Sequence, residues 1–296
     1  MRKFLSLVFS FFIPISLWLA LCTLRENYVW SNYFETQEKV VILGDSHAQP
    51  LDIPGSLNLA KGGDPLLMPL LHLRRLTQER SSSDLSFVVL TMGPQNFSSL
   101  PEDRLNQTED RLNQKEGHED WFKGNCQRIA NALRMEEYFH APLAPLQVNG
   151  VWKQEFSILS KVLNKQPAQW SDPPQLTTSN AVKRAERHRV HLDNWFVHGE
   201  HQHEFLNQII QHCSRHELEL MLVGTPLHRE YRAQIPKDGW QDYSAYLRKC
   251  DSLHSHVQYL AYEEVDWPDS LFRDSDHLNS LGGRKLGGIL HELMLE

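Results

Sequence analysis

The chain has 296 residues, of which 41% are hydrophobic and 23% are charged, and this composition is typical of one large globular domain or two small ones. Collagen-like, disordered and disulfide-rich scaffolds are excluded, because 15 Gly and 15 Pro show no repeat and 4 Cys are too few to staple a small fold. The net charge of -7 argues against a protein that binds a phosphate backbone, so no nucleic-acid partner is expected.

The N-terminus carries an uncharged segment, residues 4–24, that is long enough to cross the hydrocarbon core of a bilayer. It is longer than the apolar region of a usual signal peptide, and no A-x-A cleavage site precedes Arg25. The sequence therefore predicts a single-pass membrane protein in which residues 1–25 are a retained signal anchor rather than a cleaved signal peptide. Because two basic residues precede the segment, the positive-inside rule places residues 26–296 outside the cytoplasm, in the periplasm or the extracellular space.

Three cysteines, Cys126, Cys213 and Cys250, belong to this exported part. An oxidising compartment would allow one pair of them to close and would leave one thiol over. The sequence does not assign the pair.

Short apolar runs alternate with stretches of helical periodicity. The runs predict five strands, at Lys39–Gly44, Leu57–Ala60, Ser86–Thr91, Glu219–Gly224 and Val257–Leu260. The periodic stretches predict helices at Asp64–Glu79, Glu204–His216, Trp240–Cys250 and Gly282–Leu295. A parallel crossover needs a connection of helix length, so the alternation predicts an α/β fold with a parallel sheet covered on both faces. Sites in such sheets gather at the carboxyl ends of the strands.

The stretch from about residue 97 to residue 189 fits this alternation poorly, because it is long, polar and contains Pro. We interpret it as an insertion in a single domain that spans residues 26–296. Within it, residues 102–108 and 109–115 form a tandem duplication of seven residues, which is typical of a tolerant surface segment.

The motif Gly44-Asp45-Ser46-His47 follows the first predicted strand directly. This position puts Ser46 at the carboxyl edge of the sheet, near the start of a following helix, where backbone N–H groups can meet an anion. A GDS tripeptide by itself is typical of a turn, so its interpretation depends on possible partners elsewhere in the chain.

Such partners are found in one loop before the last predicted helix, where Asp274 and His277 are three residues apart. This spacing allows Asp274 to bond one ring nitrogen of His277, so that the other nitrogen can take a proton from Ser46. The alternative for the loop alone is that Asp274 or Asp276 is an acid at a helix N-terminus and that His277 is a surface residue.

Two further patches, Asn58–Asp64 and Gly93–Asn96, follow the second and third predicted strands. Acyl transfer through a serine needs donors that point at the oxygen of the tetrahedral intermediate. A glycine N–H and a side-chain amide from these patches, together with the N–H of Ser46, would supply three.

In this order the four patches resemble the SGNH/GDSL hydrolase superfamily, over residues 40–296. The motifs are G-D-S-H, the N-x-x-x-x-G-D around Gly63, the G-x-x-N that ends at Asn96 and the D-x-x-H-L-N around His277. The resemblance implies a flavodoxin-like fold, a three-layer α/β/α sandwich. An enzyme of this family would need no metal and no organic cofactor.

The resemblance also implies roles for individual residues. Ser46 would be the nucleophile, His277 the base and Asp274 the residue that orients the base. Gly63 and a side-chain amide would join the N–H of Ser46 as oxyanion donors. The family usually has G-x-N-D where this chain has G-P-Q-N, so the amide is Asn96 or Gln95, of which we favour Asn96.

An anchor joined to such a domain is similar to membrane-tethered members of the family that add or remove acyl groups on envelope or exported polysaccharides, in teichoic-acid D-alanylation and alginate acetylation among others. The expected activity is that of a serine esterase or O-acyltransferase on acyl esters of a carbohydrate, with acetyl as the expected group and a membrane acyltransferase as a candidate partner. Of the loop Gly224–Arg232, His228 and Tyr231 are candidate substrate-binding residues, with ordinary packing at the sheet edge as the alternative.

Two other functions remain open. One is hydrolysis of lipid or small esters, and the other is a non-catalytic scaffold for polysaccharide assembly with the same fold. No metal site is predicted for the histidine-rich stretch His188–His203, because it lacks H-E-x-x-H and a Cys pair. Aromatic residues that could stack on sugars, or pack in the core, are Trp195, Phe196, Trp240, Tyr243 and Tyr246.

Overall fold

The computed structural model describes residues 38–79, 85–103, 105 and 176–296. The anchor predicted at residues 1–25 and most of the predicted insertion lie outside the described residues. Among the helices of the described ranges, none is both long and apolar enough to span a bilayer.

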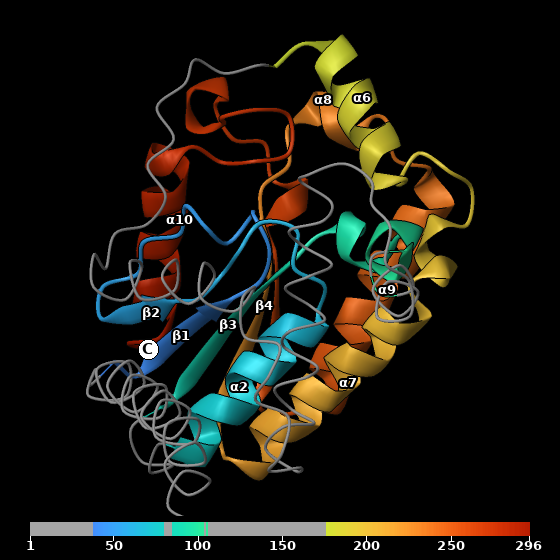
Figure 1. Ribbon diagram of the computed structural model, residues 1–296. Coiled ribbons are helices and arrows are strands. Elements are labelled where there is room, and N and C mark those ends of the chain that lie inside the picture. Colours follow the sequence, from blue (N-terminus) through green and yellow to red (C-terminus); the bar gives the residue numbers. More distant parts are fainter. Residues whose placement is uncertain (1–37, 80–84, 104, 106–175) are drawn as a thin grey trace, which may run out of the picture. The chain divides into compact units, whose positions relative to one another are not determined.

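A parallel sheet forms the centre of residues 38–296 (Figure 1). Its strands are β1 (Val40–Leu43), β2 (Ser56–Asn58), β3 (Phe87–Met92), β4 (Glu219–Gly224) and β5 (Val257–Ala261). They lie in the order β2-β1-β3-β4-β5, and every neighbouring pair is parallel. The structure thus confirms the five predicted strands and the α/β class. β1 and β3 are short, largely apolar runs, as expected for strands that are covered on both faces.

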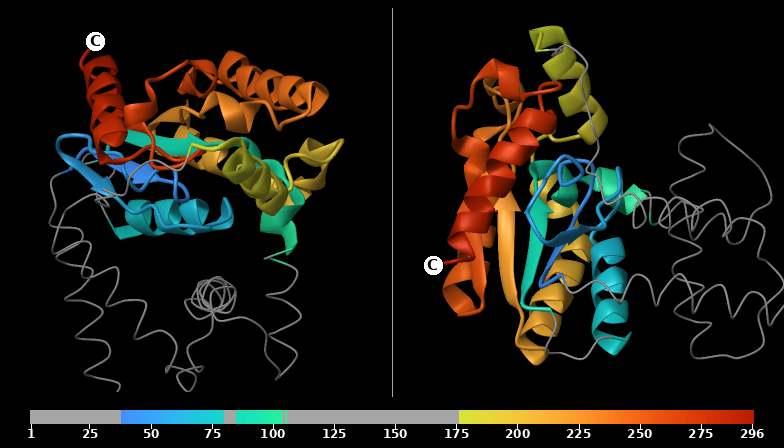
Figure 2. Two further views of the ribbon diagram at one scale, coloured as in Figure 1. Left: turned by 90° about the horizontal axis from the view of Figure 1, so that it is seen from above. Right: turned by 90° about the vertical axis from the view of Figure 1, so that its left-hand side faces the viewer.

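Helices cover both faces of this sheet. Four long ones are α2 (Leu67–Glu79), α7 (Glu200–Arg215), α9 (Lys237–Leu253) and α10 (Ser280–Leu293). α2 and α7 pack side by side on one face, whereas α10 lies on the opposite face (Figure 2). α9 packs against β5, and its Tyr246 hydroxyl donates to the carbonyl of His203 on α7.

The core under α10 shows how the strand pattern is used. Val40 and Ile42 of β1 point to this face and pack with Val89 of β3 and with Leu286 and Leu290 of α10. All five are buried. Successive side chains of a strand point to opposite faces, so the alternate residues of β1 are available to the other layer.

The connection after β1 differs from the prediction of a helix that starts near Ser46. Residues 46–50 form successive turns, in which the N–H of Ala48 donates to Asp45 and that of Leu51 donates to Ala48. Pro50 lies in the middle of the connection and has no N–H to donate, so a helix that starts near Ser46 would be interrupted there. The expectation of a helix N-terminus beside Ser46 is therefore wrong.

Among the helices that the sequence pattern did not predict, two lie at the candidate site. α6 (Thr178–His188) falls inside the predicted insertion and packs on the short helix α8 (Arg229–Arg232). A 3-10 turn, η1 (Pro94–Phe97), follows β3. Both elements carry residues of the candidate site.

Cys213 and Cys250 are buried free thiols. Cys126, the third cysteine of the predicted exported part, lies outside the described residues.

Candidate active site

The structure brings Ser46, His277 and Asp274 together at the carboxyl edge of the sheet. His277 Nε2 lies 2.7 Å from Ser46 Oγ, and its Nδ1 lies 2.9 Å from Asp274 Oδ1. Both distances are within hydrogen-bond range. A hydroxyl, an imidazole and a carboxylate in this line have the geometry in which a serine is activated as a nucleophile.

The position of Ser46 depends on a glycine at the end of β1. Gly44 has a φ of +134°, and a Cβ at this residue would lie 2.2 Å from Thr91 Oγ1 of β3. Only glycine fits both the backbone angle and the space, so the chain can turn sharply and present Ser46 next to the sheet edge.

The loop that carries Asp274 and His277 is fixed by its own hydrogen bonds. Phe272 and Leu278 form an antiparallel bridge across it, and the N–H of Arg273 donates to the carbonyl of His277 at 2.9 Å. Asp274 Oδ1 also accepts the backbone N–H of His277, at 2.9 Å. The three-residue spacing is therefore that of a tight turn. In this turn the Asp274 carboxylate contacts both the backbone N–H and the ring Nδ1 of His277, and so it fixes the orientation of the imidazole.

His47 and Asp45 form a second carboxylate–imidazole pair beside the first. Asp45 Oδ1 accepts from the backbone N–H of His47 and lies 2.9 Å from its Nδ1. Burial acts to lower the pKa of His47, but the charge of Asp45 and the bonds to Asp45 and Asp276 raise it to about 10. For Asp45, burial acts to raise the pKa, and the opposing charge and hydrogen bonds of His47 hold it well below its usual range. His47 is therefore a buried cation at neutral pH.

The rings of His47 and His277 are stacked, with centroids 4.4 Å apart and planes 21° from parallel. A cationic ring thus lies against the imidazole that faces Ser46. Burial and the charge of His47 act to lower the pKa of His277, and the charge of Asp276 acts to raise it, with a net shift upward from the ordinary value.

Asp276 and Arg184 complete a charged network that the sequence analysis missed. Asp276 is 0% exposed, and Arg184 from α6 donates to it through both Nε and Nη2, the latter at 3.1 Å. Arg184 Nη1 also lies 3.3 Å from Asp274 Oδ2. Burial acts to raise the pKa of Asp276, but the neighbouring imidazoles hold it well below its usual range, so the carboxylate stays charged.

Three groups approach Nδ1 of His277. Asp274 Oδ1 lies 2.9 Å from it, Arg184 Nη2 2.7 Å and Asp276 Oδ2 3.4 Å. One ring nitrogen cannot donate to Asp274 and accept from Arg184 at once. The proton-accepting tautomer is the one in which Nδ1–H donates to Asp274, with Arg184 held by the two carboxylates.

His188 lies one helical turn after Arg184 and faces the same network. Its Nδ1 lies 2.8 Å from the hydroxyl of Tyr231. Burial lowers the pKa of His188 to about 3, so this imidazole is neutral and its 3.7 Å approach to Asp276 is no ion pair. The i, i+4 spacing of Arg184 and His188 was a visible signal that both share one helix face.

The predicted oxyanion donors lie around the same pocket as Ser46. Gly63 has a φ of +80°, which a glycine adopts without strain. Asn96 Oδ1 accepts the N–H of Gly93 at 2.7 Å, and its Nδ2 has no hydrogen-bond partner among the residues that the structure describes. Gln95 Nε2 is engaged at 3.1 Å by Asp45 Oδ2. Of the two candidate amides, that of Gln95 is therefore already engaged, whereas the Nδ2 of Asn96 is not.

We call the cavity around these groups the Ser46 pocket. Its volume is about 310 Å³. Most of its lining is polar or charged: Asp45, Ser46, His47, Gln49, Asp64, Gln95, Asn96, Arg184, Arg187, His188, Arg273, Asp274 and His277. Leu100 and Pro101 add a small apolar wall.

His228 and Tyr231, the candidate substrate-binding residues, do not line this pocket. Both are buried, and the Tyr231 side chain is 0% exposed. His228 Nε2 lies 3.2 Å from Asp269, and its backbone N–H donates to the carbonyl of Ser275. Their placement corresponds to the alternative of loop packing, with Tyr231 reaching the site only through His188.

One group of described side chains has the spacing of metal ligands. His47, Asp276 and His277 each offer an atom, and these atoms lie within 4.8 Å of one another. The guanidinium of Arg184 already hydrogen-bonds Asp276 and contacts His277 Nδ1, so a metal ion would have to displace a cation that the network holds. In the histidine-rich stretch, His201 pairs with Glu102 and His203 approaches the carbonyl of Phe196.

The sequence matches no model of a known protein family, and no curated protein matches it either.

Proposed function

We propose that the protein is a serine esterase or O-acyltransferase that works through an acyl-Ser46 intermediate. The observation that carries the proposal is the line from Ser46 Oγ through His277 to Asp274, with distances of 2.7 Å and 2.9 Å. It joins residues that are 231 positions apart in the chain, in a pocket open to a small ligand.

In the first half of the reaction, Ser46 Oγ attacks the carbonyl carbon of the ester and its proton passes to His277 Nε2. Asp274 keeps Nδ1 protonated and stabilises the imidazolium. The N–H groups of Ser46 and Gly63 and the amide of Asn96 donate to the tetrahedral oxygen. When the intermediate collapses, the alcohol leaves with the proton from His277, and the acyl group stays on Ser46.

In the second half, water or a sugar hydroxyl attacks the acyl-enzyme. His277 takes the proton of the attacking oxygen and returns it to Ser46 Oγ as the serine leaves. Water as the acceptor gives hydrolysis and releases a carboxylic acid. A sugar hydroxyl gives a new ester and makes the protein a transferase.

We assign the chain to the SGNH/GDSL hydrolase superfamily and to its three-layer α/β/α sandwich. The strand order β2-β1-β3-β4-β5 is the order of flavodoxin-like sheets, and helices lie on both faces. The four motifs support the same assignment.

The substrate class that fits the pocket best is an acyl ester of a carbohydrate, with acetyl as the acyl group. A volume of about 310 Å³ and a lining of amides, carboxylates and guanidinium groups suit a hydroxylated ring, whereas a lipid ester would call for a broad apolar mouth. Residues 1–25 would anchor the protein, with residues 26–296 outside the cytoplasm. In the transferase case a membrane acyltransferase would supply the acyl group.

The test is acetate release from acetylated alginate and acetylated xylan by the full-length protein in mild detergent. We expect release by the wild type and none by Ser46→Ala or His277→Ala. p-Nitrophenyl acetate should be hydrolysed and p-nitrophenyl palmitate should not. Cleavage of the palmitate in preference to the acetate would favour a lipid esterase, and inactivity of the folded wild type on every ester would favour a scaffold.

A further inference from the structure

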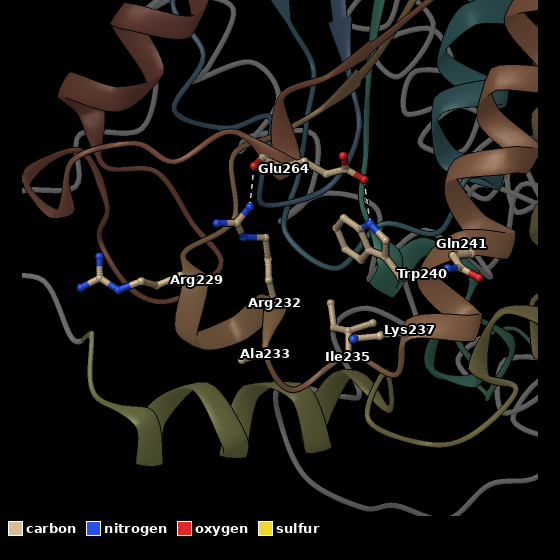
Figure 3. A pocket seen from close by; sticks show the side chains of 8 residues that line it. All are labelled: Arg229, Arg232, Ala233, Ile235, Lys237, Trp240, Gln241 and Glu264. Atoms are coloured by element: carbon tan, nitrogen blue, oxygen red, sulfur yellow. Dashed lines mark hydrogen bonds between the residues drawn. The ribbon is translucent and has the colours of Figure 1, made fainter.

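A second pocket lies beside α8, and we call it the Trp240 pocket (Figure 3). Its volume is about 440 Å³. The side chains used below are Arg229, Arg232, Ile235, Lys237, Trp240 and Glu264. None of them takes part in the chemistry proposed for Ser46.

α8 lines this pocket and is connected to the Ser46 pocket through Tyr231 and His188. Tyr231 is buried and its hydroxyl contacts His188, which lines the Ser46 pocket. Arg229 and Arg232 lie on the other side and line the Trp240 pocket. The backbone N–H of His228 also donates to Ser275, in the loop of Asp274 and His277. The packing of α8 on α6 therefore links the two pockets.

Positive charge dominates the Trp240 pocket, with three cationic side chains and one carboxylate in its lining. Arg229 is 66% exposed, and its Nη1 comes no nearer than 3.9 Å to Asp269. Lys237 is exposed and has no ion pair among the residues that the structure describes. Arg232 is engaged by Asp266 and by the carbonyl of Glu264. Two of the three cations are thus available to an anion in the pocket.

A fixed aromatic ring lines the same pocket as these cations. Trp240 Nε1 donates to Glu264 Oε1 at 2.8 Å (Figure 3). This hydrogen bond holds the indole in place and engages Glu264, whose carboxylate is the only one in the lining of the pocket. Ile235 adds an apolar surface. A held aromatic ring offers an apolar contact surface at small cost in conformational entropy, and cationic side chains at its edge select for negative charge.

We propose that the Trp240 pocket binds an acidic sugar residue, a hexuronate, of the polysaccharide whose ester is cleaved at Ser46. The apolar face of the sugar ring packs on Trp240, and Lys237 and Arg229 supply the positive charge that attracts its carboxylate. The pocket next to Ser46 then receives the acylated residue of the same chain. The connection between the two pockets rests on the proposed function. Binding of the acidic sugar to the Trp240 pocket is measured separately and does not depend on esterase activity.

The experiment measures binding of tetrasaccharides to the full-length Ser46→Ala protein by calorimetry and tryptophan fluorescence. The probes are tetrasaccharides of galacturonate, of mannuronate and of guluronate, with maltotetraose as the neutral comparison. At least one acidic probe should bind about tenfold more tightly than maltotetraose. Lys237→Gln and Arg229→Gln should each weaken it by about threefold to fivefold, as expected for exposed ion pairs.

Two further substitutions separate the aromatic surface from folding. Trp240→Ala should weaken binding and Trp240→Phe should retain most of it, with thermal melts to check that both fold. Lys249→Gln is the matched control, because Lys249 is also exposed on α9 but does not line the pocket. The control should bind like the parent protein.

Equal binding of acidic and neutral probes, or no effect of Lys237→Gln, Arg229→Gln and Trp240→Ala, would overturn the assignment. In the protein that keeps Ser46, the same substitutions in the Trp240 pocket should raise the KM for an acetylated acidic polymer and leave the hydrolysis of p-nitrophenyl acetate unchanged. Acidic-sugar binding without any esterase activity would refute the proposed function alone, whereas esterase activity without binding would refute the Trp240 pocket alone.

Discussion

Replacing His47 by Gln should shift the pH dependence of catalysis. His47 is a buried cation whose ring centroid lies 4.4 Å from that of His277. The substitution removes this positive charge and leaves Asp45 and Asp276 without their imidazolium partner. Both changes stabilise the protonated form of His277, so its pKa should rise.

The stacking distance sets the size of the effect. Two unit charges about 4.4 Å apart interact by about 4 kcal/mol at an effective dielectric constant of about 20, and by about 1 kcal/mol at the dielectric constant of water. Because one pKa unit corresponds to about 1.4 kcal/mol, the pKa of His277 should rise by roughly 0.7 to 3 in His47→Gln. His277 acts as a base only when it is neutral, so activity should be lost at a higher pH than in the wild type.

The assay is kcat/KM for p-nitrophenyl acetate between about pH 5 and about pH 9, where the acid limb reports the base of the free enzyme. His188→Gln is the matched control, because His188 lines the same pocket but is neutral, its pKa being lowered by burial to about 3. The control should keep the wild-type acid limb. An acid limb that stays in place or moves to lower pH in His47→Gln would refute the reasoning.

Three other substitutions test the charged network, the oxyanion donor and a buried carboxyl. Arg184→Met removes the guanidinium that pairs with both Asp274 and Asp276 and should lower the free energy of unfolding in urea by about 3 kcal/mol; an unchanged value would mean that these pairs do not stabilise the fold. Asn96→Ala should lower kcat for p-nitrophenyl acetate by about 100-fold, and equal loss in Gln95→Ala would contradict the choice of Asn96. Burial raises the pKa of Glu263 from its ordinary 4.5 to about 7, although hydrogen bonds from Tyr259 and the backbone act to lower it. The contribution of Glu263 to stability is therefore fully present below pH 4.5 and is lost as the pH rises through about 7. Glu263→Gln should therefore gain stability over the wild type at about pH 8 relative to about pH 5, and a gain independent of pH would contradict the assignment.

The strands could be predicted from the sequence because their signal is local. Runs such as Val40–Leu43 and Phe87–Met92 are apolar because both faces of a covered parallel sheet exclude water. Asp274 and His277 could be found for a similar reason, since their pairing lies within one turn of three residues.

Arg184 could not be found in this way, because its contacts with Asp276 span 92 positions and α6 lies in a polar stretch without a strand pattern. The predicted helix near Ser46 was wrong, and Pro50, which lacks the N–H that a helix would use, was a local signal against it. For His228 and Tyr231, the sequence shows a loop at the sheet edge, and only the packing of α6 on α8 shows that Tyr231 is turned inward.

The central claim is that Ser46 is a nucleophile activated by His277. The most direct test is labelling of the full-length protein with a fluorophosphonate probe, followed by mass mapping of the modified peptide, because this probe reacts with activated serines. We predict a single adduct on Ser46 in the wild type, and none in Ser46→Ala or His277→Ala. A folded wild type that is not labelled, or labelling of Ser46 that persists in His277→Ala, would contradict the account.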